Sequence, residues 1–147
     1  MLRGLTTITY VATDVAAAAA WYTELLGVAP YFARPDAEAP AYVEFRIGDR
    51  QAELGIVDAR WIAGGQSDRP SGTVTYWAVD DVQAAYDRLL ALGATPHEPP
   101  TERGEGFVTA SVVDPYGNVV GVMYNQHYLG MLETTATPPL LTTTPTT

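Results

Sequence analysis

Two stretches, DVAAAAAWYTELLG (residues 14–27) and DVQAAYDRLLALG (residues 81–93), decide the fold of this chain. Each begins with aspartate, a preferred N-cap residue, continues with good helix formers, and contains or ends at a glycine suited to a C-cap. Their aspartates lie about 67 residues apart, which is typical of a duplicated unit. The two stretches therefore predict two amphipathic helices in an internal repeat.

Segments with β-branched or alternating residues flank both predicted helices. They predict strands at 5–12, 41–48 and 51–57 in the first half, and at 73–80, 106–113 and 119–125 in the second. The Pro-rich stretches 29–40 and 94–105 are predicted to be loops. In the turn DPYGN (114–118), Pro115 fixes φ, and Gly117 and Asn118 are expected to tolerate positive φ.

One helix per half cannot cover both faces of a sheet. Each sheet is therefore expected to bury one face under its helix and to leave the other face to a partner sheet or a ligand. The alternation agrees, since Val43 and Phe45 point one way and Tyr42, Glu44 and Arg46 the other. A face that mixes polar and apolar side chains suits a binding cleft better than a dry core.

Composition narrows the function classes. The 147 residues carry a formal charge of −9, contain no Cys, and include eight basic residues, all of them Arg. Lysine Schiff-base chemistry, a P-loop lysine, thiolate metal sites and disulfides are thereby excluded. The acidic balance argues against nucleic acid and against an anionic membrane surface. No targeting or membrane-spanning segment is apparent, and we expect a cytoplasmic protein.

The chain is predicted to form one domain over residues 1–130, with module one at about 5–62 and module two at about 72–128. Residues 131–147 are rich in Thr and Pro, and we expect a flexible tail there.

Three motifs on this repeated frame resemble one family. The first helix with Asp14, the segment VDDVQAAYDRLLALGA, and the segment DPYGNVVGVMYNQ resemble the vicinal oxygen chelate superfamily of glyoxalases, bleomycin-resistance proteins and extradiol dioxygenases. The resemblance covers residues 5 to about 128. It implies an α+β fold of two tandem βαβββ modules, whose curled mixed sheets enclose a cleft, and it implies a homodimer.

The resemblance also implies where a divalent metal would bind. Family enzymes use four inward-facing positions, which here hold Thr7, Glu53, Val74 and Gly121. Only Glu53 is a good ligand, because Thr coordinates poorly at neutral pH and Val and Gly side chains do not coordinate. His97, in a predicted loop, and His127, past the last predicted strand, are off the predicted cleft. We therefore expect neither a metal nor another cofactor.

Glu53 is the candidate for catalysis. On a partly buried strand its pKa is expected to be raised by desolvation, which favours acid–base chemistry, although a structural ion pair is an alternative. Arg46 is expected either to pair with Glu44 on the surface or to clamp an anionic ligand. The candidate ligand-binding residues are Thr7, Thr9, Arg46, Tyr76, Phe107, Thr109 and Met123.

Three functions remain open on this sequence. The first is metal-independent binding of a drug-like molecule or aromatic metabolite, similar to bleomycin-resistance proteins. The second is a lyase, isomerase or dioxygenase that has an atypical metal site or uses Glu53 as its acid or base. The third is an interaction module with a decayed pocket. The expected partner is a small molecule, without nucleic acid or membrane.

Overall fold

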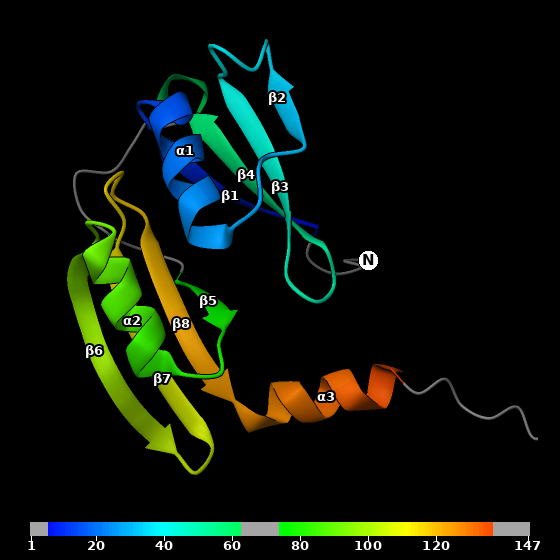
Figure 1. Cartoon of the computed structure of the whole chain (residues 1–147), viewed down its shortest axis with the longest axis vertical. Helices are drawn as coiled ribbons and strands as arrows, with labels where there is room; N and C mark the ends of the chain where they lie inside the picture. Colours follow the sequence, from blue (N-terminus) through cyan, green and yellow to red (C-terminus); the bar gives the residue numbers. More distant parts are fainter. Residues whose placement is uncertain (1–5, 63–73, 137–147) are drawn as a thin grey trace, which may run out of the picture.

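Two modules of the same βαβββ order make up the computed structural model, which describes residues 6–62 and 74–136 (Figure 1). Module one contains β1 (Thr7–Ala12), α1 (Val15–Leu26), β2 (Phe32–Arg34), β3 (Tyr42–Ile47) and β4 (Ala52–Asp58), followed by the short 3-10 helix η1 (Ala59–Trp61). Module two contains β5 (Thr75–Ala78), α2 (Val82–Ala91), β6 (Thr95–Gly104), β7 (Phe107–Val113) and β8 (Val119–Asn125). A third helix, α3 (Gln126–Ala136), follows β8.

Each module forms its own four-stranded sheet, and the two sheets share one topology. Their strand orders are β1-β4-β3-β2 and β5-β8-β7-β6. In each, the first strand pairs in parallel with the last, and the other pairs are antiparallel. The predicted α+β class and duplicated βαβββ modules are confirmed. The sheets remain separate and do not close into a barrel around an enclosed cleft.

The two predicted N-cap residues cap their helices in the structure. Asp14 accepts a hydrogen bond from the backbone N–H of Ala17 at 2.9 Å, and Asp81 accepts one from Ala84 at 2.9 Å. Helix α1 ends at Gly27, whose φ of 71° is the left-handed conformation that glycine adopts without strain.

Two predicted loops contain strands. Residues 32–34 form β2, and the Pro-rich stretch after α2 forms the long strand β6. Both strands lie at sheet edges, where proline costs little because one side of the strand has no ladder to complete. The register of β6 against β7 also shifts at three places, which accommodates the prolines. Proline is a weak reason to reject an edge strand.

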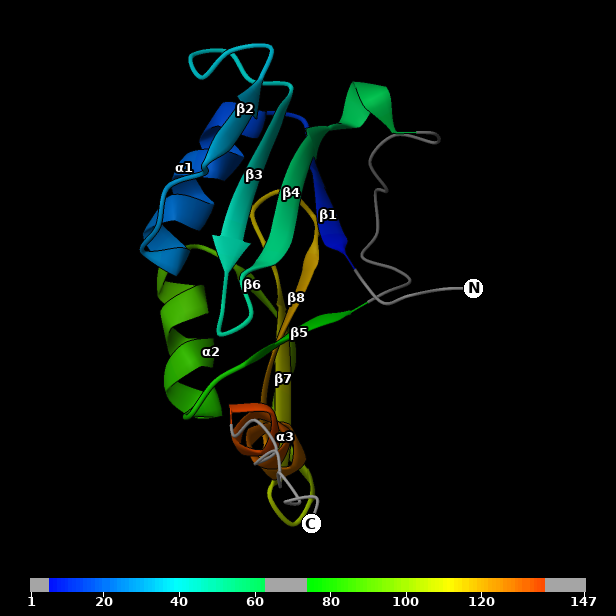
Figure 2. The same cartoon turned by 90° about the vertical axis from the view of Figure 1, so that its right-hand side faces the viewer.

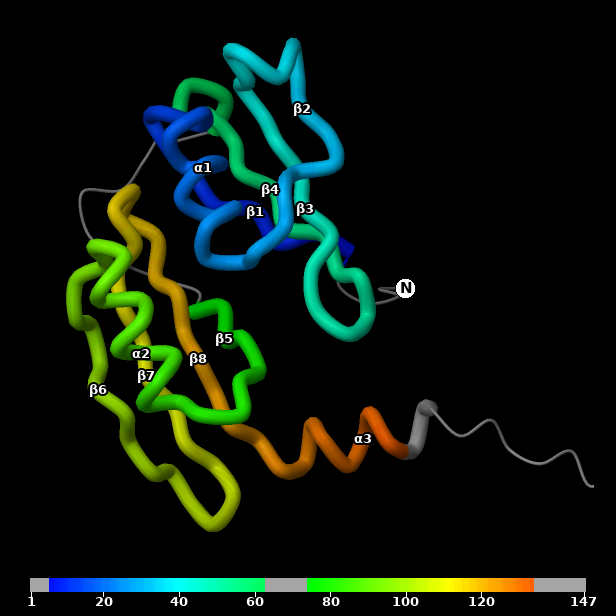
Figure 3. The backbone as a smooth tube through the Cα atoms, viewed as in Figure 1, coloured from blue at the N-terminus to red at the C-terminus, as the bar shows by residue number. Residues whose placement is uncertain are grey.

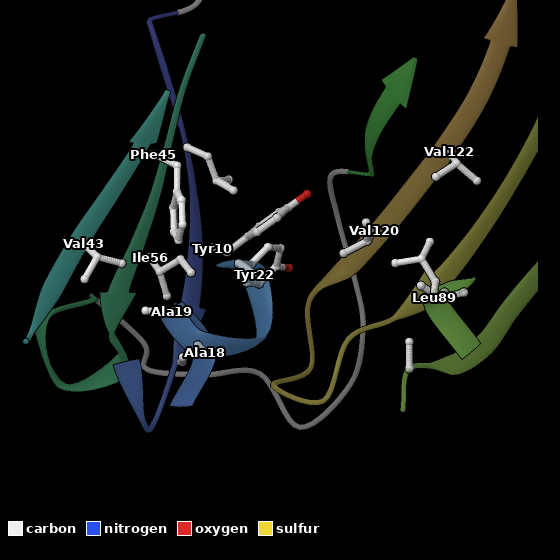
Figure 4. Packing of buried hydrophobic residues seen from close by; sticks show 14 of the residues in the cluster. Tyr10, Ala18, Ala19, Tyr22, Val43, Phe45, Ile56, Leu89, Val120 and Val122 are labelled. Atoms are coloured by element: carbon white, nitrogen blue, oxygen red, sulfur yellow. The ribbon is translucent and has the colours of Figure 1, made fainter. Parts of the chain in front are cut away.

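Helices α1 and α2 lie on the same side of the two sheets, as Figure 2 shows. The buried apolar residues beneath them form one cluster that draws on both modules. Figure 4 shows Tyr10 and Tyr22 between the side chains of the first sheet, such as Phe45, and those of the second, such as Val120. We call the face of each sheet that is turned away from α1 and α2 the open face.

The turn between β7 and β8 fastens the two modules together. Asn118 accepts a hydrogen bond from the backbone N–H of Val11 and donates one to its carbonyl, both at 3.0 Å. Asp114, 3% exposed, accepts one from the hydroxyl of Tyr22 at 2.7 Å. Gly117 takes a positive φ of 92°, whereas Asn118 does not use this conformation. We call the contacts of Asn118 with Val11 and of Asp114 with Tyr22 the Asn118 clasp.

Helix α3 projects from the end of β8 (Figure 3). Its first turn is capped by Asn125, whose side-chain oxygen accepts from the backbone N–H of His127 at 3.0 Å. Residues 131–136, expected in a flexible tail, are helical, and the rest of that predicted tail lies outside the described residues. None of the described helices is long and apolar enough to span a membrane.

Candidate functional site

A row of three polar side chains crosses the open face of the first sheet. Strand register places Thr7 of β1 beside Glu53 of β4, and Glu53 beside Arg46 of β3. The Thr7 hydroxyl donates to Oε2 of Glu53 at 2.7 Å, and Nη1 of Arg46 lies 2.7 Å from Oε1. Both oxygens of the Glu53 carboxylate are therefore engaged.

These contacts reverse the prediction for Glu53. The hydrogen bond from Thr7 and the charge of Arg46 hold the pKa of its carboxyl below the usual range and outweigh partial desolvation, which acts the other way. The expected rise in the pKa of Glu53 is therefore wrong, because the side chain is only half-buried and has two partners. At neutral pH the group is an ion-paired carboxylate, which cannot donate a proton.

Glu44, two residues along β3 from Arg46, behaves in the opposite way. Its pKa is raised by desolvation and by the negative charge of Glu53, although Arg46 acts against both. The hydroxyl of Tyr42 donates to Oε2 of Glu44 at 2.6 Å. The expected surface pair of Glu44 with Arg46 is not formed, because Arg46 binds Glu53 on the neighbouring strand. Of the two carboxyls on this face, Glu44 is therefore the one whose pKa is raised.

Both sheets place a tyrosine ring over a glycine on the open face. A Cβ atom built on Gly55 of β4 would lie 2.6 Å from the hydroxyl of Tyr42. A Cβ atom built on Gly121 of β8 would lie 2.5 Å from Cδ1 of Tyr76, whose side chain is 39% exposed. Neither glycine has room for a side chain, so each tyrosine ring defines the surface at its position.

The remaining predicted ligand-binding residues lie on the open faces but differ in access. Thr9 is exposed and lies opposite Gly55. Phe107 and Met123 of the second sheet are half-buried. Thr109 is 4% exposed and accepts a hydrogen bond from Nε of Arg103 at 3.1 Å, so it is covered by a β6 side chain.

The histidines occupy different environments. His97 lies on β6 and not in a loop as predicted, and its Nδ1 is 2.9 Å from Oγ of the buried Ser111. His127 lies exposed in the first turn of α3. The contact between His97 and Ser111 was not predicted, because β6 was assigned to a loop. No sequence signal was available, because Ser111 pairs in register with Glu98 and His97 lies at a register shift of β6.

The predicted site residues form two groups and not one constellation. Thr7, Arg46 and Glu53 form a connected polar network on the first sheet. Tyr76, Phe107 and Met123 are a mainly apolar group on the second. Within residues 6–62 and 74–136, no hydrogen bond or ion pair joins the two groups.

The four positions that the resemblance assigns to a metal do not fit a divalent cation. Glu53 supplies a carboxylate that Arg46 already neutralises, and the Thr7 hydroxyl donates a hydrogen bond to that carboxylate. Val74 offers hydrocarbon, and Tyr76 covers Gly121. The described part of the chain also brings together no group of three His, Asp or Glu side chains that could hold a metal ion.

Sequence analysis also missed an arginine and a tryptophan at the far end of the first open face. The guanidinium of Arg34 lies 5.5 Å from the centre of the Phe32 ring, and Trp61 of η1 is 72% exposed. Neither residue belongs to a motif, and each lies next to breaker-rich sequence, so no periodic signal was available. The contacts of the Asn118 clasp were missed because only tertiary packing brings Val11 and Tyr22 to this turn.

Comparisons with known structures agree on the fold. A glyoxalase-related enzyme from Fulvimarina pelagi is 22% identical with a TM-score of 0.66, over 84% of this chain and 89% of that one. Lactoylglutathione lyase from Agrobacterium tumefaciens is 21% identical with a TM-score of 0.61, over 83% and 93%. TioX from Micromonospora sp. ML1 is 16% identical with a TM-score of 0.63, over 83% and 98%.

At these identities the structural likenesses establish the fold alone. Comparison with curated protein sequences finds no match. The family model of the Glyoxalase/Bleomycin resistance protein/Dioxygenase superfamily, however, matches residues 4–122, which is most of the chain and includes both modules. This chain therefore belongs to the Glyoxalase/Bleomycin resistance protein/Dioxygenase superfamily.

Proposed function

We propose that this protein binds a small organic molecule, drug-like or an aromatic metabolite, on its open faces and does so without a metal. The observation that carries the proposal is the state of the family's metal positions. Glu53 is engaged by Thr7 and Arg46, and the ring of Tyr76 fills the space over Gly121. A ligand there meets hydrogen-bonding and aromatic groups in place of a cation.

The two groups of side chains take complementary parts in this proposal. Thr7, Thr9, Arg46 and Glu53 fix polar groups of the ligand on the first sheet. Tyr76, Phe107 and Met123 contact its apolar or planar part on the second, where exposed aromatic rings favour stacking. Thr109 takes part through Arg103, which covers it.

Metal content tests the first half of the proposal. Untagged protein from cells supplied with iron, manganese, zinc and nickel is analysed by plasma mass spectrometry. We expect far less than one metal ion per chain, because the four positions offer one neutralised carboxylate. A stoichiometric metal that a Glu53→Gln variant loses would contradict the proposal.

A thermal-shift screen of antibiotics and aromatic metabolites tests the second half. For a ligand that stabilises the protein, Tyr76→Ala and Phe107→Ala should each weaken binding about tenfold, the loss expected for one aromatic contact of about 1.5 kcal/mol. Val28→Ala removes a 44% exposed apolar side chain directly after α1, outside both ligand-binding groups, and should leave affinity unchanged. Unchanged affinity in all three variants would reject this surface, and a screen without any ligand would favour the interaction module.

Acid–base catalysis is a second candidate, and the raised pKa of Glu44 favours that residue over Glu53. The hydrogen bond that the Tyr42 hydroxyl donates to Glu44 holds this carboxyl in a fixed orientation. If a substrate is found, Glu44→Gln should abolish turnover and retain binding. The same effect from Glu53→Gln, with Glu44→Gln active, would return the role to Glu53.

The proposal includes a homodimer, which the family resemblance suggests, and a cytoplasmic location, which the lack of Cys suggests. Light scattering after size-exclusion chromatography is expected to give twice the mass of one chain. A monomer over the full concentration range would contradict this part and leave the ligand proposal intact.

A further inference from the structure

A second pocket lies at the far end of the first open face, where β2, β3 and β4 approach η1. It encloses about 540 Å³, within the range of small-molecule sites. We call it the Arg34 pocket. It is lined by Arg34, Pro35, Ala41, Tyr42, Val57 and Trp61. It shares no residue with the ligand-binding groups of the proposed function.

The pocket presents a positive charge that none of the described carboxylates neutralises. Arg46, Arg60 and Arg103 each form an ion pair with a carboxylate. Among the residues that the structure describes, no carboxylate pairs with Arg34, whose guanidinium only lies over the ring of Phe32. In a chain of net charge −9, a guanidinium left without an acidic partner is available to an anion from outside.

The other walls of the pocket are aromatic and apolar. Trp61 is 72% exposed, whereas the indole N–H groups of Trp21 and Trp77 bind acceptors within the protein at 2.8 and 3.3 Å. Tyr42 is held edge-on against Phe32, with 6.3 Å between the ring centroids. An exposed indole and a fixed phenol ring around one cavity offer surfaces on which a planar ring can stack.

We propose that the Arg34 pocket is a binding site for a planar aromatic carboxylate. The carboxylate binds the Arg34 guanidinium, whose paired N–H groups match its two oxygens. The ring lies against Trp61 and Tyr42, and Pro35, Ala41 and Val57 complete the apolar lining. A neutral amide of the same shape loses the charge-assisted bonds, and an aromatic amine meets like charge.

Isothermal titration calorimetry of the full chain at pH 7 tests this site with three matched probes: 2-naphthoate, 2-naphthamide and 2-naphthylmethylamine. We expect naphthoate to bind at least about tenfold more tightly than the amide, because one charge-assisted contact contributes about 1.5–3 kcal/mol. Arg34→Gln should remove that preference and leave amide binding unchanged. Trp61→Ala should weaken both.

Arg60→Gln is the control, because it removes the same charge next to the pocket from an arginine already paired with Asp58. It should retain the preference for naphthoate. Equal binding of naphthoate and amide, or equal losses in Arg34→Gln and Arg60→Gln, would overturn the proposal. Tyr76→Ala separates the two sites: if it weakens naphthoate binding as much as Arg34→Gln does, the ligand sits on the second sheet and the Arg34 pocket is not its site.

A second copy of the chain is the competing occupant. Fluorescence of Trp61, isolated by subtracting the spectrum of Trp61→Phe, is followed over a range of protein concentrations without ligand. An unchanged spectrum keeps the pocket free for a small molecule. If the emission of Trp61 shifts to the blue as protein concentration rises, and naphthoate binding is lost over the same range, a contact between copies occupies the pocket and the proposal is overturned.

Discussion

Glu53 has a different chemical character from the residue that its position suggested. A glutamate on a half-buried strand is expected to resist ionisation, but Thr7 donates to one of its oxygens and Arg46 binds the other. Its charge is stabilised locally, whereas desolvation and the charge of Glu53 raise the pKa of Glu44 on the adjacent strand. Two carboxylates on one face thus differ because only one has a dedicated cation.

The pH dependence of stability should report this difference. Because the pKa of Glu53 is lowered on folding, its stabilising contribution is fully present above the usual value of 4.5 and is lost as the pH falls through the lower folded-state value. Melting temperatures of the wild type and Glu53→Gln should therefore differ most near pH 7 and converge as the pH falls below 4.5. Glu24→Gln, the same change of charge at an exposed position on α1, should give parallel curves across that range, and convergence there too would contradict the assignment.

Of the two asparagines at the ends of β8, Asn118 should contribute more to the free energy of unfolding than Asn125. Asn118→Ala removes two hydrogen bonds to the backbone of Val11 and should cost about 2–3 kcal/mol of unfolding free energy. Asn125→Ala removes the cap of α3 and a weak hydrogen bond to the sulfur of Met123, and should cost about 1 kcal/mol. Urea unfolding followed by circular dichroism measures both, and equal losses would mean that the clasp adds nothing beyond a local turn.

At the scale of elements, the two central helices begin in the same way. Asp14 and Asp81 each accept from the third backbone N–H that follows, at the same distance of 2.9 Å. Asp14→Ala and Asp81→Ala should therefore each lower the free energy of unfolding by about 1 kcal/mol. Thermal and urea denaturation measure the losses, and Asp36→Ala in the loop before β3 serves as a control. A loss confined to one helix would show that the repeat is not energetically equal.

These elements were predictable to different degrees. The central strands and both main helices follow from alternation, capping residues and the spacing of Asp14 and Asp81, all of which are local signals. Strands β2 and β6 do not, because edge strands tolerate proline and need no apolar alternation. The wrong assignment of β6 also hid the neighbourhood of His97, so an error in one element became an error in the site.

The side-chain partners within the site were less predictable than the fold. Alternation placed Glu44, Arg46 and Glu53 on one face, as the structure has them. It did not reveal that Arg46 pairs across the strands with Glu53, because that depends on the register between β3 and β4. Arg34 and Trp61 meet only through tertiary packing, which leaves no periodic trace in the sequence.

At the scale of the whole molecule, the two modules share one core. Buried side chains of both modules form a single cluster, and Trp77 donates to the Tyr10 hydroxyl between them at 3.3 Å. The modules should therefore unfold together. Tryptophan fluorescence and far-ultraviolet circular dichroism are expected to give coincident urea transitions. Tyr22→Phe, which removes the bond to Asp114, should lower the midpoint of both by the same amount.

Two separated transitions in the wild-type protein would contradict the shared core. The double variant Tyr22→Phe/Asn118→Ala gives the stricter test, because it removes side-chain bonds between the modules and leaves the apolar cluster intact. If the cluster alone couples the modules, its two probes should still coincide at a lower midpoint. If the clasp does so, the transitions should separate.

The ring of Tyr76 over Gly121 also determines in which order substitutions could restore a metal ligand at position 121. A glutamate introduced at 121 alone would start from a Cβ atom 2.5 Å from Cδ1 of Tyr76, so this step on its own is expected to disturb the sheet. Replacing Tyr76 by a small residue first opens the space, and the acidic side chain then has room. The order of the two substitutions therefore matters. The pair is tolerated when Tyr76 is replaced first and is harmful when Gly121 is replaced first.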